Sequence, residues 1–266
     1  MQDDSAQFEK IRFELKGRLA HITLNNPPDN LLSLQLLGEW SELMETVAGQ
    51  AETAALLVSA SGPSFIGGLD YSEHTREMVF SALERFRNIC EFLLNVDYLT
   101  LALVDGKVRN WGCDLLPFFD LVLASSAATF QYDHLAIGTF PAVGAIMLGQ
   151  SAGFAASLQT FLTGHEMTAA QALELGLVSR VHPREELVVE LKKTLAHLST
   201  ISTPVTGLML RNLRRAKHET FQRYIDESYT DYLNILTDLE DFSEGVAAWM
   251  DRSEEHTSEL QSRQSI

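Results

Sequence analysis

The sequence predicts a mixed α/β core followed by a helical C-terminal region. Short apolar segments of strand length alternate with amphipathic helices over the first two thirds of the chain, whereas the last third carries only helical periodicity. Interleaved strands and helices are typical of a sheet covered by helices. At 266 residues, of which 45% are hydrophobic, the chain is long enough to bury a sizeable core.

The N-terminal part begins with a predicted hairpin. Residues 11–15 and 20–24 alternate apolar and polar side chains around a turn at 16–18. The consecutive prolines at 27–28 exclude a helix directly afterwards. Apolar residues at helical spacing then predict a helix over 33–48.

The middle of the chain continues this alternation. Apolar runs predict buried strands over 54–59, 99–104 and 121–124, and a single apolar face predicts a helix over 75–95. A compact, glycine-containing segment at 106–120 separates the last two strands.

Capping signals define the helices that follow. A helix ends at Gly164, and Thr168 is a candidate N-cap for a short helix over 169–175. The next helix carries leucines at helical spacing, at Leu187, Leu191, Leu195 and Leu198.

Composition excludes several classes of function. A formal charge of −16 and a pI of about 4.8 disfavour binding to nucleic acid or to an anionic membrane through bulk charge. No apolar run is long enough to span a bilayer, and the acidic N-terminus lacks the features of a secretory signal. Cys90 and Cys113 lack metal-ligand spacing and indicate reduced thiols in a cytoplasmic protein. No clustered ligand set or dinucleotide glycine fingerprint occurs, so we expect neither a metal nor a redox cofactor.

Several segments, in this order and spacing, resemble the crotonase (enoyl-CoA hydratase/isomerase) superfamily. They are Phe-Ile-Gly-Gly-Leu-Asp at 65–70, Asp-Gly-Lys-Val-Arg-Asn-Trp-Gly-Cys-Asp-Leu at 105–115, Leu-Thr-Gly at 162–164, the alanine-rich helix and Gly-Leu-Val run at 169–183, and Asp-Phe-Ser-Glu-Gly at 241–245. The resemblance covers about residues 8–251.

The resemblance implies a crotonase-like spiral of repeated ββα units. We expect this core over 1–200 and a helical oligomerisation region over 201–251, which would pack between subunits of a homotrimer or homohexamer. The polar segment 252–266 resembles the translation of a sequencing adapter, so we expect a disordered, artefactual tail.

The resemblance also implies an oxyanion hole made of two backbone N–H groups, those of Leu69 and Trp111. Backbone amides stabilise a thioester enolate without requiring a particular side chain. Trp111 stands where the family has glycine, and its side chain is expected to narrow the acyl pocket. By the same resemblance the substrate-binding residues are Ile66, Gly67, Gly68, Asp70, Gly112 and Pro141.

Both positions at which family hydratases carry a catalytic glutamate differ here. The first is Asp114, whose carboxylate is set back by roughly 1.5 Å because aspartate is one methylene shorter. The second is His134, an imidazole suited to proton exchange near neutrality, with Asp133 or Asp114 available to fix its tautomer. The alternative is structural: a partly exposed helix aspartate and a hydrogen-bonding histidine. Tyr132 and Asp133 are weaker catalytic candidates.

Two further groups of polar residues have both functional and structural interpretations. Glu73 and His74 follow the first loop and either approach the substrate or serve as caps and surface residues. A basic cluster follows in the helical region, and an exposed helix face is favoured over contact with a coenzyme A phosphate. Its members are Arg211, Arg214, Arg215 and Lys217.

The expected activity is hydration of an enoyl- or cyclic dienoyl-CoA thioester, which is substrate rather than cofactor. Segments 65–74 and 138–141 are most similar to cyclohexa-1,5-dienecarbonyl-CoA hydratases. The altered glutamate positions leave open isomerisation, hydrolysis or decarboxylation, and also a subunit that binds acyl-CoA without turnover.

Overall fold

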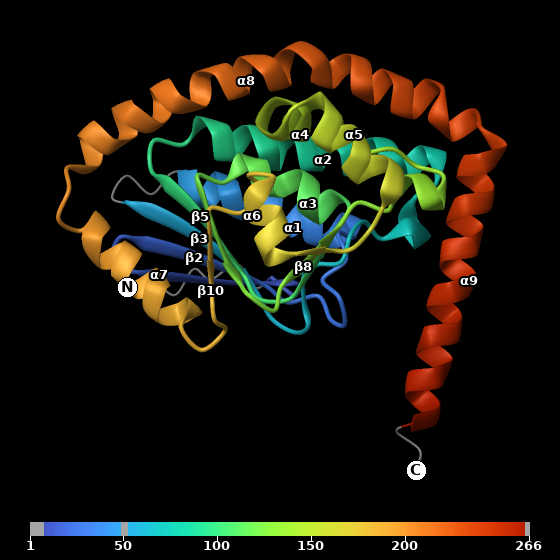
Figure 1. Cartoon of the computed structure of the whole chain (residues 1–266), viewed down its shortest axis with the longest axis horizontal. Helices are drawn as coiled ribbons and strands as arrows, with labels where there is room; N and C mark the ends of the chain where they lie inside the picture. The colour runs from blue at the N-terminus through green and yellow to red at the C-terminus, as the bar shows by residue number, and fades with distance from the viewer. Residues whose placement is uncertain (1–7, 49–52, 264–266) are drawn as a thin grey trace.

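The structure, a computed structural model, describes residues 8–48 and 53–263 and has the expected α/β core (Figure 1). In this part of the chain six strands form one sheet, which is parallel except for its first pair. In spatial order the strands are β1 (Ile11–Lys16), β2 (Leu19–Leu24), β3 (Ala55–Ala60), β5 (Leu99–Val104), β7 (Leu121–Ser125) and β10 (Arg180–His182).

The N-terminal hairpin is confirmed. Strands β1 and β2 pair antiparallel, with Lys16 opposite Leu19. Gly17 in the turn has a φ of 61°, a left-handed conformation that glycine adopts without steric strain.

A second, smaller sheet completes the ββα repeat. Within the described residues its strands are β4 (Ser64–Ile66), β6 (Lys107–Arg109), β8 (Thr129–Gln131) and β9 (Met167–Thr168). The first three each follow a strand of the larger sheet and precede a helix, which confirms the expected architecture. The sequence pattern did not reveal them, because three residues are too few to establish a periodicity.

The helices predicted over 33–48, 75–95 and 169–175 form with boundaries shifted by a single residue. Thr168 and Gln171 make a reciprocal capping box at the start of the last of these, and Gly164 ends the helix before it in a left-handed conformation. The helices are α1 (Leu34–Ala48), α2 (Arg76–Asn95), α3 (Trp111–Leu115), α4 (Gly144–Ala152), α5 (Phe154–Thr163), α6 (Ala169–Glu174), α7 (Leu187–Leu198), α8 (Thr203–Asn234) and α9 (Glu240–Arg263). Single-turn helices are η1 (Tyr71–Glu73), η2 (Leu116–Phe118), η3 (His134–Ile137) and η4 (Leu236–Asp238).

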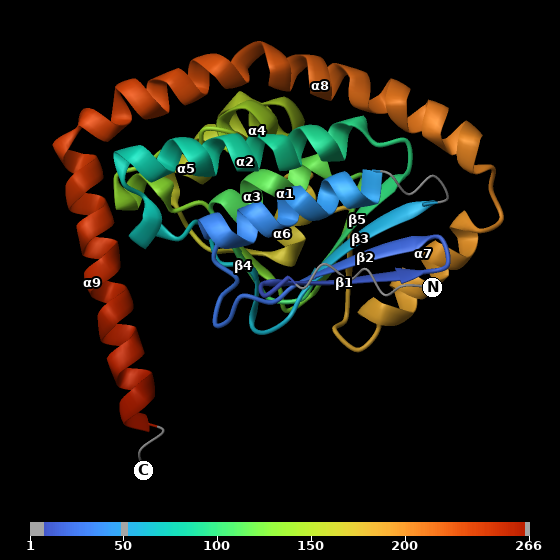
Figure 2. The same ribbon diagram turned by 180° about the vertical axis from the view of Figure 1, so that it is seen from behind.

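Helix α8 arches over the core, and α9 turns away from its end (Figures 1 and 2). Helix α8 packs against α2 and α4, and α9 packs against η1 and η3. The backbone of α9 is helical to Arg263, which differs from the disordered tail expected from residue 252. Helix propagation is cooperative, so a polar segment adds turns to an existing helix at little cost.

The main hydrophobic core joins the large sheet to the helices above it. Its largest fully buried side chains include Trp40, Trp111, Tyr132 and Tyr232. Trp111 and Tyr132 belong to the segments for which the sequence predicts a catalytic site, so that site is built into the core. Among the described helices, none is long and apolar enough to cross a membrane.

Candidate active site

The two segments that carry the predicted amide donors lie side by side. Gly112 approaches Ile66 so closely that a Cβ on the glycine would lie 2.8 Å from the Ile66 carbonyl oxygen. A Cβ on Gly68 would lie 3.8 Å from the carbonyl oxygen of Arg109. Only glycine permits the first of these approaches, so residue 112 sets the distance between the two segments.

The N–H groups of Leu69 and Trp111 donate no hydrogen bond to an acceptor within the described residues. Leu69 forms a bridge with Leu32, but the bonds of that bridge use the Gly68 carbonyl and the Asp70 N–H. Trp111 is the first residue of α3, and N–H groups in the first turn of a helix have no intrahelical acceptor. Both amides therefore keep a free donor.

Asn110 orients the second of these amides, a role that the sequence interpretation missed. Its φ of 47° and ψ of −115° match the first central residue of a type II′ turn, where glycine and asparagine are favoured. Its N–H donates to the Gln131 carbonyl, and its Oδ1 accepts from the Asp133 N–H at 2.9 Å. Asn110 thus holds the start of α3 against the loop that leads to His134.

We expect Asn110→Ala to destabilise the protein by about 1–3 kcal/mol, because it loses the buried hydrogen bond and forces an alanine into a strained conformation. Asn110→Gly keeps the backbone conformation, so it should lose less stability than Asn110→Ala. Urea unfolding of both variants measures the difference. An equal loss for the two variants would contradict the proposed backbone role.

Asp114 and His134 are brought together and buried. Each is 1% exposed, and His134 Nε2 lies 4.0 Å from Asp114 Oδ2. Burial raises the pKa of Asp114 well above its usual value, against a smaller lowering by the Gly144 backbone amide. Burial, with a smaller contribution from His74, lowers the pKa of His134 to about 3. Although the distance is within ion-pair range, both shifts favour a neutral carboxylic acid beside a neutral imidazole.

The Asp114 carboxyl fits against the start of α4 because residue 144 is glycine. A Cβ at Gly144 would lie 2.1 Å from Asp114 Oδ1 and 3.2 Å from Pro141 Cβ. Pro141 therefore lies near the Asp114 carboxyl, and its role in substrate binding stays a prediction. In the structure as described, Asp114 Oδ1 and both ring nitrogens of His134 have no hydrogen-bond partner. Their unsatisfied hydrogen-bonding groups mark the pair as a candidate site. The structural alternative, a partly exposed Asp114, is wrong.

Tyr132 packs against one member of this pair, and other aromatic side chains fill the core around the segments that carry it. The Tyr132 ring stacks on His134 with centroids 6.1 Å apart. Trp111 is 2% exposed and packs on Phe86 at 4.8 Å, so its side chain fills core space beside the amide that it carries. Tyr71 packs edge-on against Trp249 of α9 at 5.2 Å. In this conformation the site is closed to solvent.

His74 and Glu73 both have structural partners. His74 is buried, its Nε2 lies 2.7 Å from the Tyr232 hydroxyl, and burial lowers its pKa to about 3. Glu73 accepts a hydrogen bond from the Leu34 N–H at the start of α1. Asp70, predicted to bind substrate, caps η1 by accepting from the Ser72 N–H.

The two buried histidines predict a loss of stability in acid. The pKa of His74 and of His134 is about 3 in the folded protein and 6.5 in the unfolded chain. Below pH 6.5 the unfolded chain binds more protons, so each histidine should remove about 1.4 kcal/mol per pH unit as the pH falls toward 3. Urea unfolding between pH 7.5 and 4.5 should show a shallower pH dependence for His74→Gln than for the wild type. The exposed control His197→Gln should match the wild type, and an unchanged slope in His74→Gln would refute the assignment.

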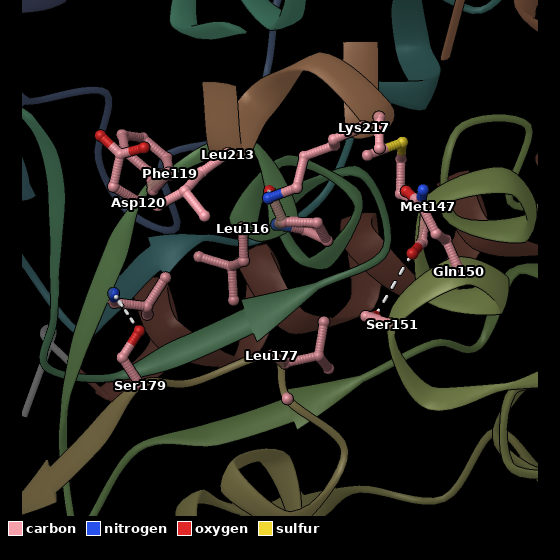
Figure 3. A pocket seen from close by; sticks show the side chains of 14 residues that line it. Leu116, Phe119, Asp120, Met147, Gln150, Ser151, Leu177, Ser179, Leu213 and Lys217 are labelled. Atoms are coloured by element: carbon pink, nitrogen blue, oxygen red, sulfur yellow. Dashed lines mark hydrogen bonds between the residues drawn. The ribbon is translucent and has the colours of Figure 1, made fainter. Parts of the chain in front are cut away.

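The basic cluster of α8 is mostly engaged within the chain. Arg214 is 4% exposed and donates hydrogen bonds to Asp120. It therefore neither lies on an exposed helix face nor has its guanidinium available to a coenzyme A phosphate. Arg211 pairs with Asp97. Lys217 donates to the Pro117 carbonyl at the edge of a cavity of about 330 Å³ (Figure 3). That cavity is lined by α8, α4 and the start of β7, and neither Asp114 nor His134 contributes to it.

Comparison with known proteins places the chain in a family. The sequence model of the enoyl-CoA hydratase/isomerase family matches residues 14–259. An enoyl-CoA hydratase domain-containing mitochondrial protein from Danio rerio is 29% identical over 244 residues, covering 90% of this chain and 84% of the relative. A probable enoyl-CoA hydratase from Mycobacterium bovis is 28% identical over 251 residues, covering 92% and 96%.

Solved structures share the fold. The enoyl-CoA hydratase of Bacillus halodurans superposes with a TM-score of 0.84 at 19% identity, over 90% of this chain and 99% of that one. A methylmalonyl-CoA decarboxylase in complex with 2-nitronate-propionyl-CoA superposes with a TM-score of 0.81 at 20% identity, over 92% and 97%. The chain belongs to the enoyl-CoA hydratase/isomerase family, whose members act on coenzyme A thioesters.

Proposed function

We propose that the chain hydrates an enoyl-CoA thioester, with His134 as the base and Asp114 as the acid. The observation that supports this most is the buried pair itself. Burial favours a protonated carboxyl and an unprotonated imidazole, one group with a proton to give and one with a site to receive it. Water addition requires one group of each kind.

The proposed reaction uses four groups of the chain. Water attacks the β-carbon of the thioester while His134 takes a proton from it. Negative charge moves to the thioester oxygen, where the amides of Leu69 and Trp111 stabilise it. Asp114 then gives its proton to the α-carbon.

The pair ends the reaction as imidazolium and carboxylate, and one proton transfer between them restores the neutral state. The 4.0 Å separation of Nε2 and Oδ2 requires a small side-chain movement or a bridging water for that transfer.

A cyclic dienoyl-CoA is the proposed substrate class. The similarity of segments 65–74 and 138–141 to cyclohexa-1,5-dienecarbonyl-CoA hydratases supports it. The aromatic residues Trp111 and Tyr132 also support it, because their rings would stack on a cyclic acyl group once the closed site opens. Assembly as a trimer or hexamer and a cytoplasmic location complete the proposal.

Incubation with crotonyl-CoA, with cyclohexa-1,5-dienecarbonyl-CoA and with a malonyl-type CoA ester, followed by mass spectrometry, tests this function. Hydration adds the mass of one water, hydrolysis releases free coenzyme A, and decarboxylation of a malonyl-type ester removes carbon dioxide. We expect the wild type to add water to the cyclic substrate and the Asp114→Asn variant to lose this hydration activity. Release of coenzyme A without a hydrated product would replace hydration with hydrolysis.

The second candidate function is binding of a CoA thioester without turnover. The enclosure of Asp114 and His134 favours it, because a 1% exposed pair meets no substrate unless the aromatic residues move. Calorimetric binding of a CoA ester without any change in its mass would favour this function over hydration.

A further inference from the structure

A mixed cluster of metal-ligating side chains lies outside the candidate active site. His182 ends β10, and Glu186 and Glu190 lie at the start of α7 and one turn into it. One ring nitrogen of His182 and one carboxylate oxygen from each glutamate lie within 4.8 Å of one another. The sequence did not suggest this cluster, because Pro183 separates the strand residue from the helix.

The imidazole of this cluster has an unsatisfied nitrogen. His182 Nε2 is shielded from solvent and has no hydrogen-bond partner among the described residues. A buried ring nitrogen without a partner is disfavoured unless another group satisfies it. The half-buried imidazole, with its one shielded and unsatisfied nitrogen, distinguishes the cluster from a group made only of surface carboxylates.

The two carboxylates complement that imidazole. Glu190 Oε1 accepts a hydrogen bond from the Lys193 ammonium at 2.5 Å, and the carboxylate has a second oxygen for a further partner. Glu186 is exposed, so its side chain is free to rotate toward the other two. Two anionic carboxylates and one imidazole are a ligand set used for zinc and for related divalent transition metals.

We propose that His182, Glu186 and Glu190 bind one divalent transition metal ion, for which Zn²⁺ is the probe. Tetrahedral zinc with bonds of about 2.0–2.1 Å places neighbouring ligand atoms about 3.3 Å apart. The present cluster reaches that geometry by a side-chain shift on the order of 1.5 Å, with solvent in the fourth position. The ion joins the end of β10 to α7 and strengthens the attachment of α7 to the sheet.

This site is separate from the candidate active site. Strand β10 and α7 lie on the opposite side of the molecule from α9, and α9 packs on η1 and on η3, which carries His134 (Figure 1). The role of the ion is therefore binding and stabilisation, independent of the proposed hydration.

Zinc titration of the full chain tests the proposal. After removal of metal with a chelator, Zn²⁺ is added in competition with a chromogenic chelator, and metal per chain is counted by mass spectrometry. We expect one Zn²⁺ per chain and a higher melting temperature with zinc. Glu186→Gln and His182→Ala should each weaken binding at least about tenfold, since loss of outer-shell partners alone costs about 10–100-fold.

Glu185→Gln and His197→Ala are the matched controls, because both side chains are exposed and neither belongs to the cluster. Both should bind zinc as the wild type does. Glu186 is itself exposed, so Glu186→Gln tests the site even if His182→Ala folds poorly. A wild type that binds no zinc, or a Glu186→Gln variant with unchanged zinc affinity, would overturn the proposal.

Discussion

Asp114→Asn is expected to lower kcat for hydration by about 10²–10⁴-fold, the usual contribution of a positioned acid or base. The amide has nearly the shape of the carboxyl, so the packing against Gly144 is kept while the transferable proton is lost. His134→Gln should lower kcat by a similar factor. Steady-state kinetics with the thioester that gains water measure both effects.

In Asp114→Asn the effect on catalysis can be separated from the effect on folding, because we expect kcat to fall while stability stays the same or rises. The pKa of Asp114 is raised by folding, so its contribution to stability is present below its unfolded pKa and is lost as the pH rises through the folded one. At neutral pH, Asp114→Asn should therefore unfold at the same urea concentration as the wild type or at a higher one. Asp97→Asn is the control, since Asp97 pairs with Arg211 on the surface, and it should keep the full activity. Full activity in Asp114→Asn would reject the acid assignment.

Arg214→Ala is expected to lower the free energy of unfolding by about 3–5 kcal/mol, because it leaves the largely buried Asp120 carboxylate without its cationic partner. Arg214 Nε donates to Asp120 Oδ1 at 2.8 Å, and Nη2 donates to the Tyr98 carbonyl at 2.9 Å. Asp120 Oδ2 also accepts from the Thr100 N–H of β5 at 2.7 Å. The guanidinium thus ties α8 to the sheet. Urea unfolding at fixed protein concentration measures the loss.

Arg211→Ala gives the comparison within the same helix. Arg211 makes its ion pair with Asp97 on the surface, where both side chains are more than half exposed. Such surface pairs contribute about 0–1 kcal/mol to stability. Arg211→Ala should therefore lower the free energy of unfolding several times less than Arg214→Ala does. Equal losses for Arg211→Ala and Arg214→Ala would show that burial does not set the strength of the Asp120 contact.

The sequence predicted the fold well where periodicity extends over many residues. Helix α2 and strand β5 appear where their apolar patterns place them. Strands β6 and β8 have three residues each and are defined by pairing with one another, which is tertiary information. The burial of Arg214 did have a sequence signal, because it lies four residues after Leu210 and seven before Phe221 on the apolar face of α8.

The candidate site was predicted in position but not in environment. The resemblance to the family pointed to Asp114 and His134, and the structure places them 4.0 Å apart. Burial, which shifts the pKa of both groups, depends on how the whole core packs around them, and local sequence does not show this. The role of Asn110 depends on a positive φ that residue type alone does not predict. The free amides of Leu69 and Trp111 agree with the predicted oxyanion hole, which stays a prediction.

A crystal structure with a bound, non-reactive acyl-CoA analogue is the most direct test of the central claim. That claim is that the thioester oxygen sits between the Leu69 and Trp111 amides, beside the Asp114 and His134 pair. We predict N–H to oxygen distances of about 2.7–3.1 Å from both nitrogens, with the aromatic cover displaced to admit the acyl group. A thioester bound elsewhere, or one whose oxygen contacts neither amide, would contradict the claim.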